Sequence, residues 1–239
     1  AVSFVPPDAI PQMADATEVW ARIDRNPDVR YSALVPNLRG AQRALDAGFP
    51  EIEVVVSASD THNRRNIRRS TDESLAELPA IVDLVHAYGA TLQVIVATAW
   101  GSPYEGDVPV SSVLHVVDRA LSAGADSIAY GDTTGMATPT RVTNLVEETR
   151  AAHPGLELGL HFHNTRGTGL ANVLAALQLG VDDFDASVGG LGGCPYAGFK
   201  DAPGNISTED LVHMCNELGV ETGVDLDRLA RAAQTQRLM

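Results

Sequence analysis

The chain has 239 residues, of which 44% are hydrophobic and 20% charged, and its formal net charge is −14. These proportions are typical of a globular domain with a sizeable core. The excess of acidic groups argues against nucleic acid or an anionic membrane as the main partner. Two cysteines give no disulfide framework, which fits a reducing compartment, and we expect the cytoplasm.

Short strands alternate with amphipathic helices along the whole chain. Strands are predicted where β-branched and apolar residues run together, at residues 2–4, 31–36, 51–56, 91–97, 127–130, 156–162 and 183–188. Helices are predicted where apolar residues recur at helical spacing, at residues 14–23, 38–47, 71–88, 109–123, 139–153, 169–179, 208–218 and 226–238. This alternation predicts parallel βαβ units.

Polar and glycine-rich residues collect in the segments that follow the C-terminal ends of the strands. This distribution favours an α/β fold of the (β/α)8 TIM-barrel type, with its active site at those ends. A doubly wound sheet would instead concentrate its site at one switch point. Because the sequence shows seven strands, we expect the first strand of the barrel to lie before Ala1 and residues 1–239 to form a single, N-terminally incomplete barrel domain.

His161 and His163 stand at i and i+2 around the end of a predicted strand, so both should point to the same face. Two imidazoles placed in this way could ligate one metal ion; the alternative is a hydrogen-bonded polar pair. Asn205 could add an uncharged oxygen ligand, or could simply precede a helix. Mixed ligation of this kind leaves room for water and substrate oxygens, and it suits Mg²⁺ or Mn²⁺.

Several glycines surround Cys194 in residues 187–210, which indicates a loop that brings backbone close to a ligand. A thiol in such a loop could transfer a proton or act as a nucleophile. Cys215, inside a predicted helix, is better explained as a small buried residue. Asp132, at the end of a strand, is a candidate for substrate binding or acid–base chemistry, or else a turn cap.

Other polar residues are less informative by themselves. A polar rim is predicted after the strand at 51–56, formed by Ser57, Ser59, His62, Asn66 and Ser70. Local positive charge, usually a solvated feature, comes from Arg64, Arg65, Arg68, Arg69 and Lys200. Surface or structural histidines are expected within helices or at their ends, at His86, His115, His153 and His213.

Several motifs resemble the hydroxymethylglutaryl-CoA lyases, a family of the metal-dependent TIM-barrel lyase/aldolase superfamily. They are GLHFHNTRGTGLANVLAALQLGV at 159–181, YGDTTGMATP at 130–139, and SVGGLGGCPYA with GNISTEDLV within 187–212. The resemblance extends over nearly the whole chain through SFVPPDAIPQMAD at 3–15, VPNLRG at 35–40 and SASDTHNRRNIRRS at 57–70.

The resemblance implies a retro-Claisen cleavage of 3-hydroxy-3-methylglutaryl-CoA to acetoacetate and acetyl-CoA, as in leucine degradation. It implies a divalent cation, Mg²⁺ or Mn²⁺, held by His161, His163 and Asn205, and catalytic roles for Cys194, Asp132 and His161. It also implies substrate contacts from Asn66, Ser70, Gly193 and Glu209. The expected partner is an acyl-CoA, with no nucleic acid or membrane, and the expected assembly is a homodimer or a higher homo-oligomer.

Two departures from the family pattern bear on activity. The first strand of the family carries an Arg-Asp pair, which we expect to precede Ala1, together with a glutamate. The loop from Cys194 to Asn205 is about two residues longer than expected for the family. Two alternatives stay open: a related lyase or aldolase acting on another 3-hydroxyacyl-CoA or hydroxy acid, and a non-catalytic barrel that has lost the Arg-Asp pair.

Overall fold

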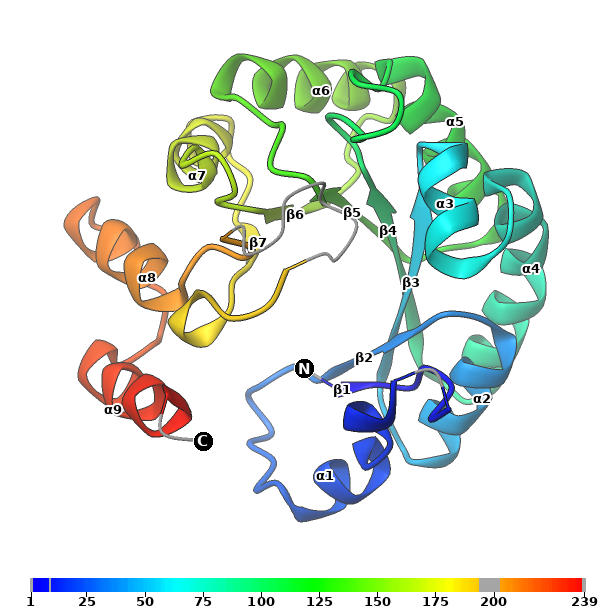
Figure 1. Cartoon of the computed structure of the whole chain (residues 1–239), viewed down its shortest axis with the longest axis horizontal. Coiled ribbons are helices and arrows are strands. Elements are labelled where there is room, and N and C mark those ends of the chain that lie inside the picture. Colours follow the sequence, from blue (N-terminus) through cyan, green and yellow to red (C-terminus); the bar gives the residue numbers. More distant parts are fainter. Residues whose placement is uncertain (1, 9, 194–202, 238–239) are drawn as a thin grey trace. The chain divides into compact units, whose positions relative to one another are not determined.

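The structure is a computed structural model and describes residues 2–8, 10–193 and 203–237 (Figure 1). Its contacts divide the chain into two compact units, one formed by Ala1–Ala97 with Ser111–Ala129 and the other by Thr98–Val110 with Tyr130–Met239. Among the helices of the described residues, none is both long enough and apolar enough to cross a membrane.

The first unit is built on parallel strands that neighbour one another in chain order. They are β1 Val2–Ser3, β2 Ser32–Val35, β3 Glu51–Ser57 and β4 Thr91–Ala97. In β4, Leu92, Val94 and Val96 are all fully buried. A parallel strand covered on both faces needs such a nearly continuous apolar sequence, which is what residues 91–97 contain.

Helices of the first unit lie against these strands (Figure 1). They are α1 Ala16–Arg22, α2 Leu38–Asp46, α3 Asp60–Ile67, α4 Thr71–Ala87 and all but the first residue of α5 Val110–Ala123, with the short 3-10 turn η1 Pro11–Met13 before them. The helix α4 begins at a capping box, in which Ser70 Oγ accepts from the Glu73 N–H at 3.0 Å and Glu73 accepts from the Ser70 N–H at 2.6 Å. Its Leu78 and Val85 are fully buried, and α2 and α4 pack against each other and against β3.

The second unit holds the rest of the chain. Its elements are the end of β5 Ser127–Asp132, then α6 Pro139–Ala152, β6 Leu158–Phe162, α7 Gly169–Gln178, β7 Asp183–Asp185, the 3-10 turn η2 Val188–Gly190, α8 Thr208–Glu217 and α9 Leu226–Arg237. Three buried aromatic rings form part of its core: the Trp100 ring lies 5.3 Å from that of Phe162 and 6.2 Å from that of Tyr130, centroid to centroid. This packing supports the ends of β5 and β6.

All the predicted helices and strands are present, with two corrections. The strand predicted at 183–188 ends at Asp185, because Gly189 and Gly190 adopt positive φ angles of 67° and 65° in η2 and turn the chain. The polar stretch after β3 contains a helix, α3, capped by Ser59, whose hydroxyl accepts from the His62 N–H at 3.1 Å. A helix this polar shows little hydrophobic periodicity, so the sequence pattern does not reveal it.

Candidate active site

The predicted pairing of His161 and His163 on one face is confirmed by the structure. The two ring centroids lie 5.0 Å apart, with the planes inclined at 58°. His163 is 5% exposed, whereas 29% of the His161 side chain reaches solvent. His163 therefore lies in the interior of the second unit, and His161 stays accessible to a ligand.

A later segment of the chain brings Asn205 next to the histidine pair. The Asn164 N–H donates to the Gly204 carbonyl at 2.6 Å, and His163 and Asn205 form an isolated antiparallel bridge. The Asn205 side-chain nitrogen donates to the Leu191 carbonyl at 2.7 Å, while its Oδ1 is buried with no hydrogen-bond partner. The amide nitrogen is thus committed and the oxygen is left for a ligand.

Glycines allow this later segment to pack closely against the backbone of residues 192 and 193. A Cβ at Gly204 would lie 1.9 Å from the Gly192 carbonyl oxygen and 2.5 Å from the Gly193 Cα. Nearby, the Glu209 carboxylate accepts from the Gly189 N–H at 3.0 and 2.9 Å. These glycines were predicted to bring backbone close to a ligand, and those described here bring backbone close to backbone. Glu209, in the first turn of α8, thus holds the 3-10 turn η2 in place.

Asp132 ends β5 and is 1% exposed. Its Oδ1 accepts from the Met136 N–H at 2.7 Å and from the Ala137 N–H at 3.1 Å, so it does cap a turn. Its Oδ2 is buried without a partner. Burial raises the pKa of Asp132 to about 6, although those two N–H groups and the charges of His161 and Arg166 favour the ionised form. The carboxyl can therefore exchange a proton near neutral pH.

His163 is held in its neutral form. Burial, together with the neighbouring His161, lowers the pKa of His163 to about 4, against a smaller opposing effect of the Thr133 backbone and the Asn205 side chain. Its Nδ1 is buried and has no hydrogen-bond partner. A neutral imidazole keeps a lone pair, which is the form that binds a metal ion.

The donors fit a divalent cation. Asp132 Oδ2, His163 Nδ1 and Asn205 Oδ1 can each donate an electron pair, and each is buried without a partner in the second unit. Such orphaned groups are costly unless a ligand satisfies them. Within the described ranges, no three His, Cys, Asp or Glu side chains gather into a metal-binding group. Asp132 is therefore not counted as a ligand with the two histidines, and the candidate ligands are His161, His163 and the Asn205 amide, a mixed set open to substrate oxygens.

One residue beside this set was missed by the sequence reasoning. Asp185, on β7, lies opposite His161 in the parallel register, and its Oδ2 is 3.1 Å from His161 Nδ1. The two residues are distant in the sequence, so only the pairing of β6 with β7 could have revealed the contact. No local pattern carried that signal.

Three more of the predicted site residues are described by the structure. Asn66 is exposed on α3, and Ser70 caps α4; both belong to the first unit. Gly193 is exposed in the second unit, where its backbone lies against that of Gly204. Cys194 and Lys200 lie outside the described residues.

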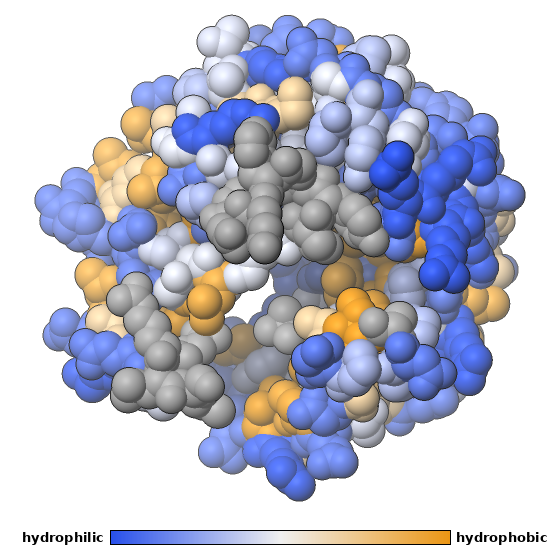
Figure 2. Space-filling model, viewed as in Figure 1, coloured by the Kyte–Doolittle hydropathy of each residue, from blue (hydrophilic) through white to orange (hydrophobic). Residues whose placement is uncertain are grey.

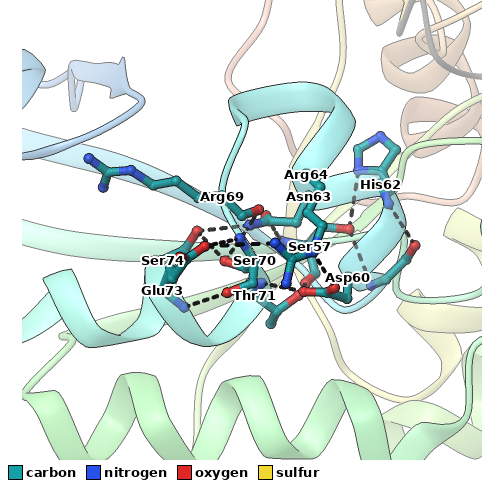
Figure 3. Close-up of polar contacts among 11 residues, drawn as sticks. Ser57, Asp60, His62, Asn63, Arg64, Arg69, Ser70, Thr71, Glu73 and Ser74 are labelled. Atoms are coloured by element: carbon teal, nitrogen blue, oxygen red, sulfur yellow. Dashed lines mark hydrogen bonds and ion pairs between the residues drawn. The ribbon is translucent and has the colours of Figure 1, made fainter.

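The predicted polar rim after β3 is corrected to a largely buried network (Figure 3). Ser57 and His62 are each 1% exposed, and His62 Nδ1 lies 3.1 Å from Ser57 Oγ. Asn63 accepts from the Ser57 N–H at 3.0 Å and donates to the Arg69 and Ser70 carbonyls, both at 2.9 Å. This network holds α3 and the start of α4 on the end of β3.

The arginines form the outer surface of that region. Figure 2 shows strongly hydrophilic surface over α3. Arg64 pairs with Asp60 at 2.7 Å and Arg69 with Glu77 at 2.6 Å, so much of the local positive charge is compensated. The exposed His86 and His115 likewise pair with carboxylates, and Cys215 is buried, as predicted.

Comparison with known proteins places these features in a family. The HMGL-like family model matches residues 7–235. Hydroxymethylglutaryl-CoA lyase of Bacillus subtilis is 44% identical over 232 residues, covering 97% of this chain and 77% of that protein. (R)-citramalyl-CoA lyase of Chloroflexus aurantiacus is 43% identical, covering 97% and 75%. A solved structure of an HMG-CoA lyase from Acinetobacter baumannii, in complex with coenzyme A and 3-methylmalate, matches at 45% identity with a TM-score of 0.92, covering 98% of this chain and 76% of that one.

These matches confirm the TIM-barrel prediction for the fold. Lyases of this family depend on a metal ion, and similar lyases of vertebrates include cytoplasmic and mitochondrial proteins. A family match over nearly the whole chain and curated relatives above 40% identity lead to one conclusion: the chain belongs to the HMGL-like family and is a carbon–carbon lyase.

Proposed function

We propose that the protein cleaves 3-hydroxy-3-methylglutaryl-CoA to acetoacetate and acetyl-CoA with the help of Mg²⁺ or Mn²⁺, in leucine degradation in the cytoplasm. The observation that carries the proposal is the set of three unpartnered, buried electron-pair donors on Asp132, His163 and Asn205. The similarity to hydroxymethylglutaryl-CoA lyases supports the choice of substrate.

His161, His163 and Asn205 are the residues that would hold the ion. When bound, a divalent cation polarises hydroxyl and carbonyl oxygens and stabilises negative charge on them. His163 is neutral above a pH of about 4, and Asn205 is uncharged, so neither of them cancels the positive charge of the ion. A site of this kind favours anionic substrate oxygens as its further ligands.

The chemistry requires two proton movements. The hydroxyl proton on C3 leaves as the C2–C3 bond breaks, and C2 of the acetyl-CoA enolate gains a proton. No water or redox partner is consumed. Asp132 suits the first movement because a carboxyl with a pKa of about 6 is mostly ionised at pH 7 and binds a proton at little cost. Cys194 is proposed for the second; this role rests on the sequence motif alone.

Substrate contacts are proposed for Asn66, Ser70, Gly193 and Glu209. The Ser70 hydroxyl and the Glu209 carboxylate already have backbone partners, so both would contribute mainly by shaping the loops that meet the substrate. An acyl-CoA is the expected substrate class, since a related lyase has been solved with coenzyme A bound. A homodimer or higher homo-oligomer is the proposed assembly.

The test measures acetoacetate and acetyl-CoA formed from 3-hydroxy-3-methylglutaryl-CoA by protein stripped with EDTA and then supplied with Mg²⁺ or Mn²⁺. We expect turnover to depend on the ion and to fall at least about 100-fold in His163→Ala and Asn205→Ala. His115→Ala, an exposed histidine on α5, serves as the matched control. Ion binding with no cleavage of any acyl-CoA would overturn the proposal and favour the non-catalytic barrel.

A second substrate is favoured by one comparison. The relative named (R)-citramalyl-CoA lyase matches this chain nearly as well as the hydroxymethylglutaryl-CoA lyases. Both names denote 3-hydroxyacyl-CoA thioesters with a carboxylate, so the same ion and proton acceptor could serve either. The ratio of kcat/KM for the two thioesters, measured side by side with one preparation, decides between them.

A further inference from the structure

Asp185 contacts the candidate metal site through His161. The parallel register of β6 and β7 places the two residues opposite each other, and Asp185 Oδ2 lies 3.1 Å from His161 Nδ1. The main-chain ladder of the sheet fixes this juxtaposition. It does not depend on the conformation of a long, flexible side chain.

The contact determines which nitrogen of His161 carries the proton. An ionised carboxylate only accepts hydrogen bonds, so Nδ1 must be the donor. In the neutral imidazole, Nε2 then keeps its lone pair. A histidine binds a metal ion through an unprotonated ring nitrogen. We infer that Asp185 is a positioning residue, which holds His161 in the Nδ1–H tautomer and presents Nε2 to the ion; this inference rests on the proposed function.

Two other His–Asp pairs show that the geometry at His161 is different. His86 contacts Asp126 at 3.0 Å and His115 contacts Asp72 at 3.3 Å, each through Nε2 and each from a helix surface. His161 contacts its carboxylate through Nδ1, beside a second, buried histidine. Of these three histidines, only His161 has its ring beside that of another candidate ligand, His163. A carboxylate that hydrogen-bonds a ligating histidine commonly strengthens metal binding about 10- to 100-fold.

The test combines a metal-free readout with a binding readout. Nitrogen-15 NMR of histidine-labelled protein without metal should show His161 as the Nδ1–H tautomer, and Asp185→Ala should introduce the Nε2–H form. Mn²⁺ titration followed by EPR should show affinity about 10- to 100-fold weaker in Asp185→Ala. Asp185→Asn, which keeps an oxygen acceptor, should lie between Asp185→Ala and the native protein. Asp182→Ala, an exposed carboxylate just before β7, should match the native protein.

A double variant tests whether Asp185 acts through His161. Adding Asp185→Ala to His161→Ala should weaken Mn²⁺ binding no further. Additive losses, or an unchanged tautomer and affinity in Asp185→Ala, would overturn the inference while leaving the proposed site in place. Failure of the native protein to bind Mn²⁺ would overturn both. Thermal unfolding of each variant confirms that the comparison is between folded proteins.

Discussion

His163 and Asn205 are held side by side by a single antiparallel bridge, although one follows β6 and the other precedes α8. The bridge depends on a close crossing of two glycine backbones, Gly192 and Gly204. The chain therefore assembles its candidate ligands by main-chain contacts. Single substitutions can test that assembly and the electrostatics of the groups that it buries.

Gly204→Ala should damage the site more than it damages the fold. A methyl group would have to lie 1.9 Å from the Gly192 carbonyl oxygen, so the crossing must open and Asn205 must move. We expect Mn²⁺ affinity to fall at least about tenfold. Gly155→Ala is the control: its φ is +85°, no neighbour lies within 4 Å of the added carbon, and only backbone strain of about 1 kcal/mol is added. Equal Mn²⁺ affinities in the two variants would show that the close approach of Gly192 and Gly204 does not position Asn205.

Asp132→Asn should stabilise the metal-free protein at neutral pH and abolish its activity. Folding raises the pKa of Asp132 from about 3.9 to about 6. The folded state therefore binds the proton more tightly, and stability falls as pH rises through this window. Above it, the buried charge costs on the order of 3 kcal/mol, which the amide removes while keeping the oxygen that caps the turn.

Urea unfolding from pH 4 to pH 8 measures this effect. The stability difference between Asp132→Asn and the native protein should be near zero at pH 4 and should reach its full value at about pH 7. Asp182→Asn, at an exposed carboxylate, is the control for the substitution itself. A difference that does not vary with pH would show that Asp132 titrates normally.

His163→Gln should have the opposite pH dependence. Folding lowers the pKa of His163 from about 6.5 to about 4. The unfolded chain therefore takes up the proton first, and the native protein loses up to about 3 kcal/mol as pH falls from 6.5 to 4. Because glutamine does not titrate, the metal-free variant should gain stability relative to the native protein over that range. In the native protein, this loss of stability at low pH is opposed by the gain of stability as Asp132 is protonated. The two contributions can therefore be separated only in the single variants.

Ser70→Ala and Glu73→Ala break the two halves of one capping box. Each should lower the free energy of unfolding by about 1 kcal/mol, since each leaves a helix N-terminal group unpaired. The pair also tests the proposed substrate role of Ser70. If Ser70 contacts substrate, Ser70→Ala raises KM and Glu73→Ala does not; equal KM values would restrict Ser70 to capping.

Local sequence determined the elements of this protein. The nearly apolar run at 91–97 and the Ser70–Glu73 box are complete within a few residues, so β4 and α4 could be predicted with their limits. The shared face of His161 and His163 is equally local, because alternate residues of a strand point the same way. The polar helix α3 has no hydrophobic periodicity that would predict it. It is stabilised by the Ser59 cap and by hydrogen bonds such as that from the Ser57 N–H to Asn63.

The tertiary structure decided how the site is assembled and charged. Asn205 reaches His163 only because two glycine backbones cross, and Asp185 reaches His161 only because β6 and β7 adopt one register. The pKa of Asp132 near 6 follows from the burial of its carboxyl in the folded chain. These properties depend on contacts between residues distant in sequence, and hydrophobic periodicity, capping motifs and turn residues describe only neighbours along the chain.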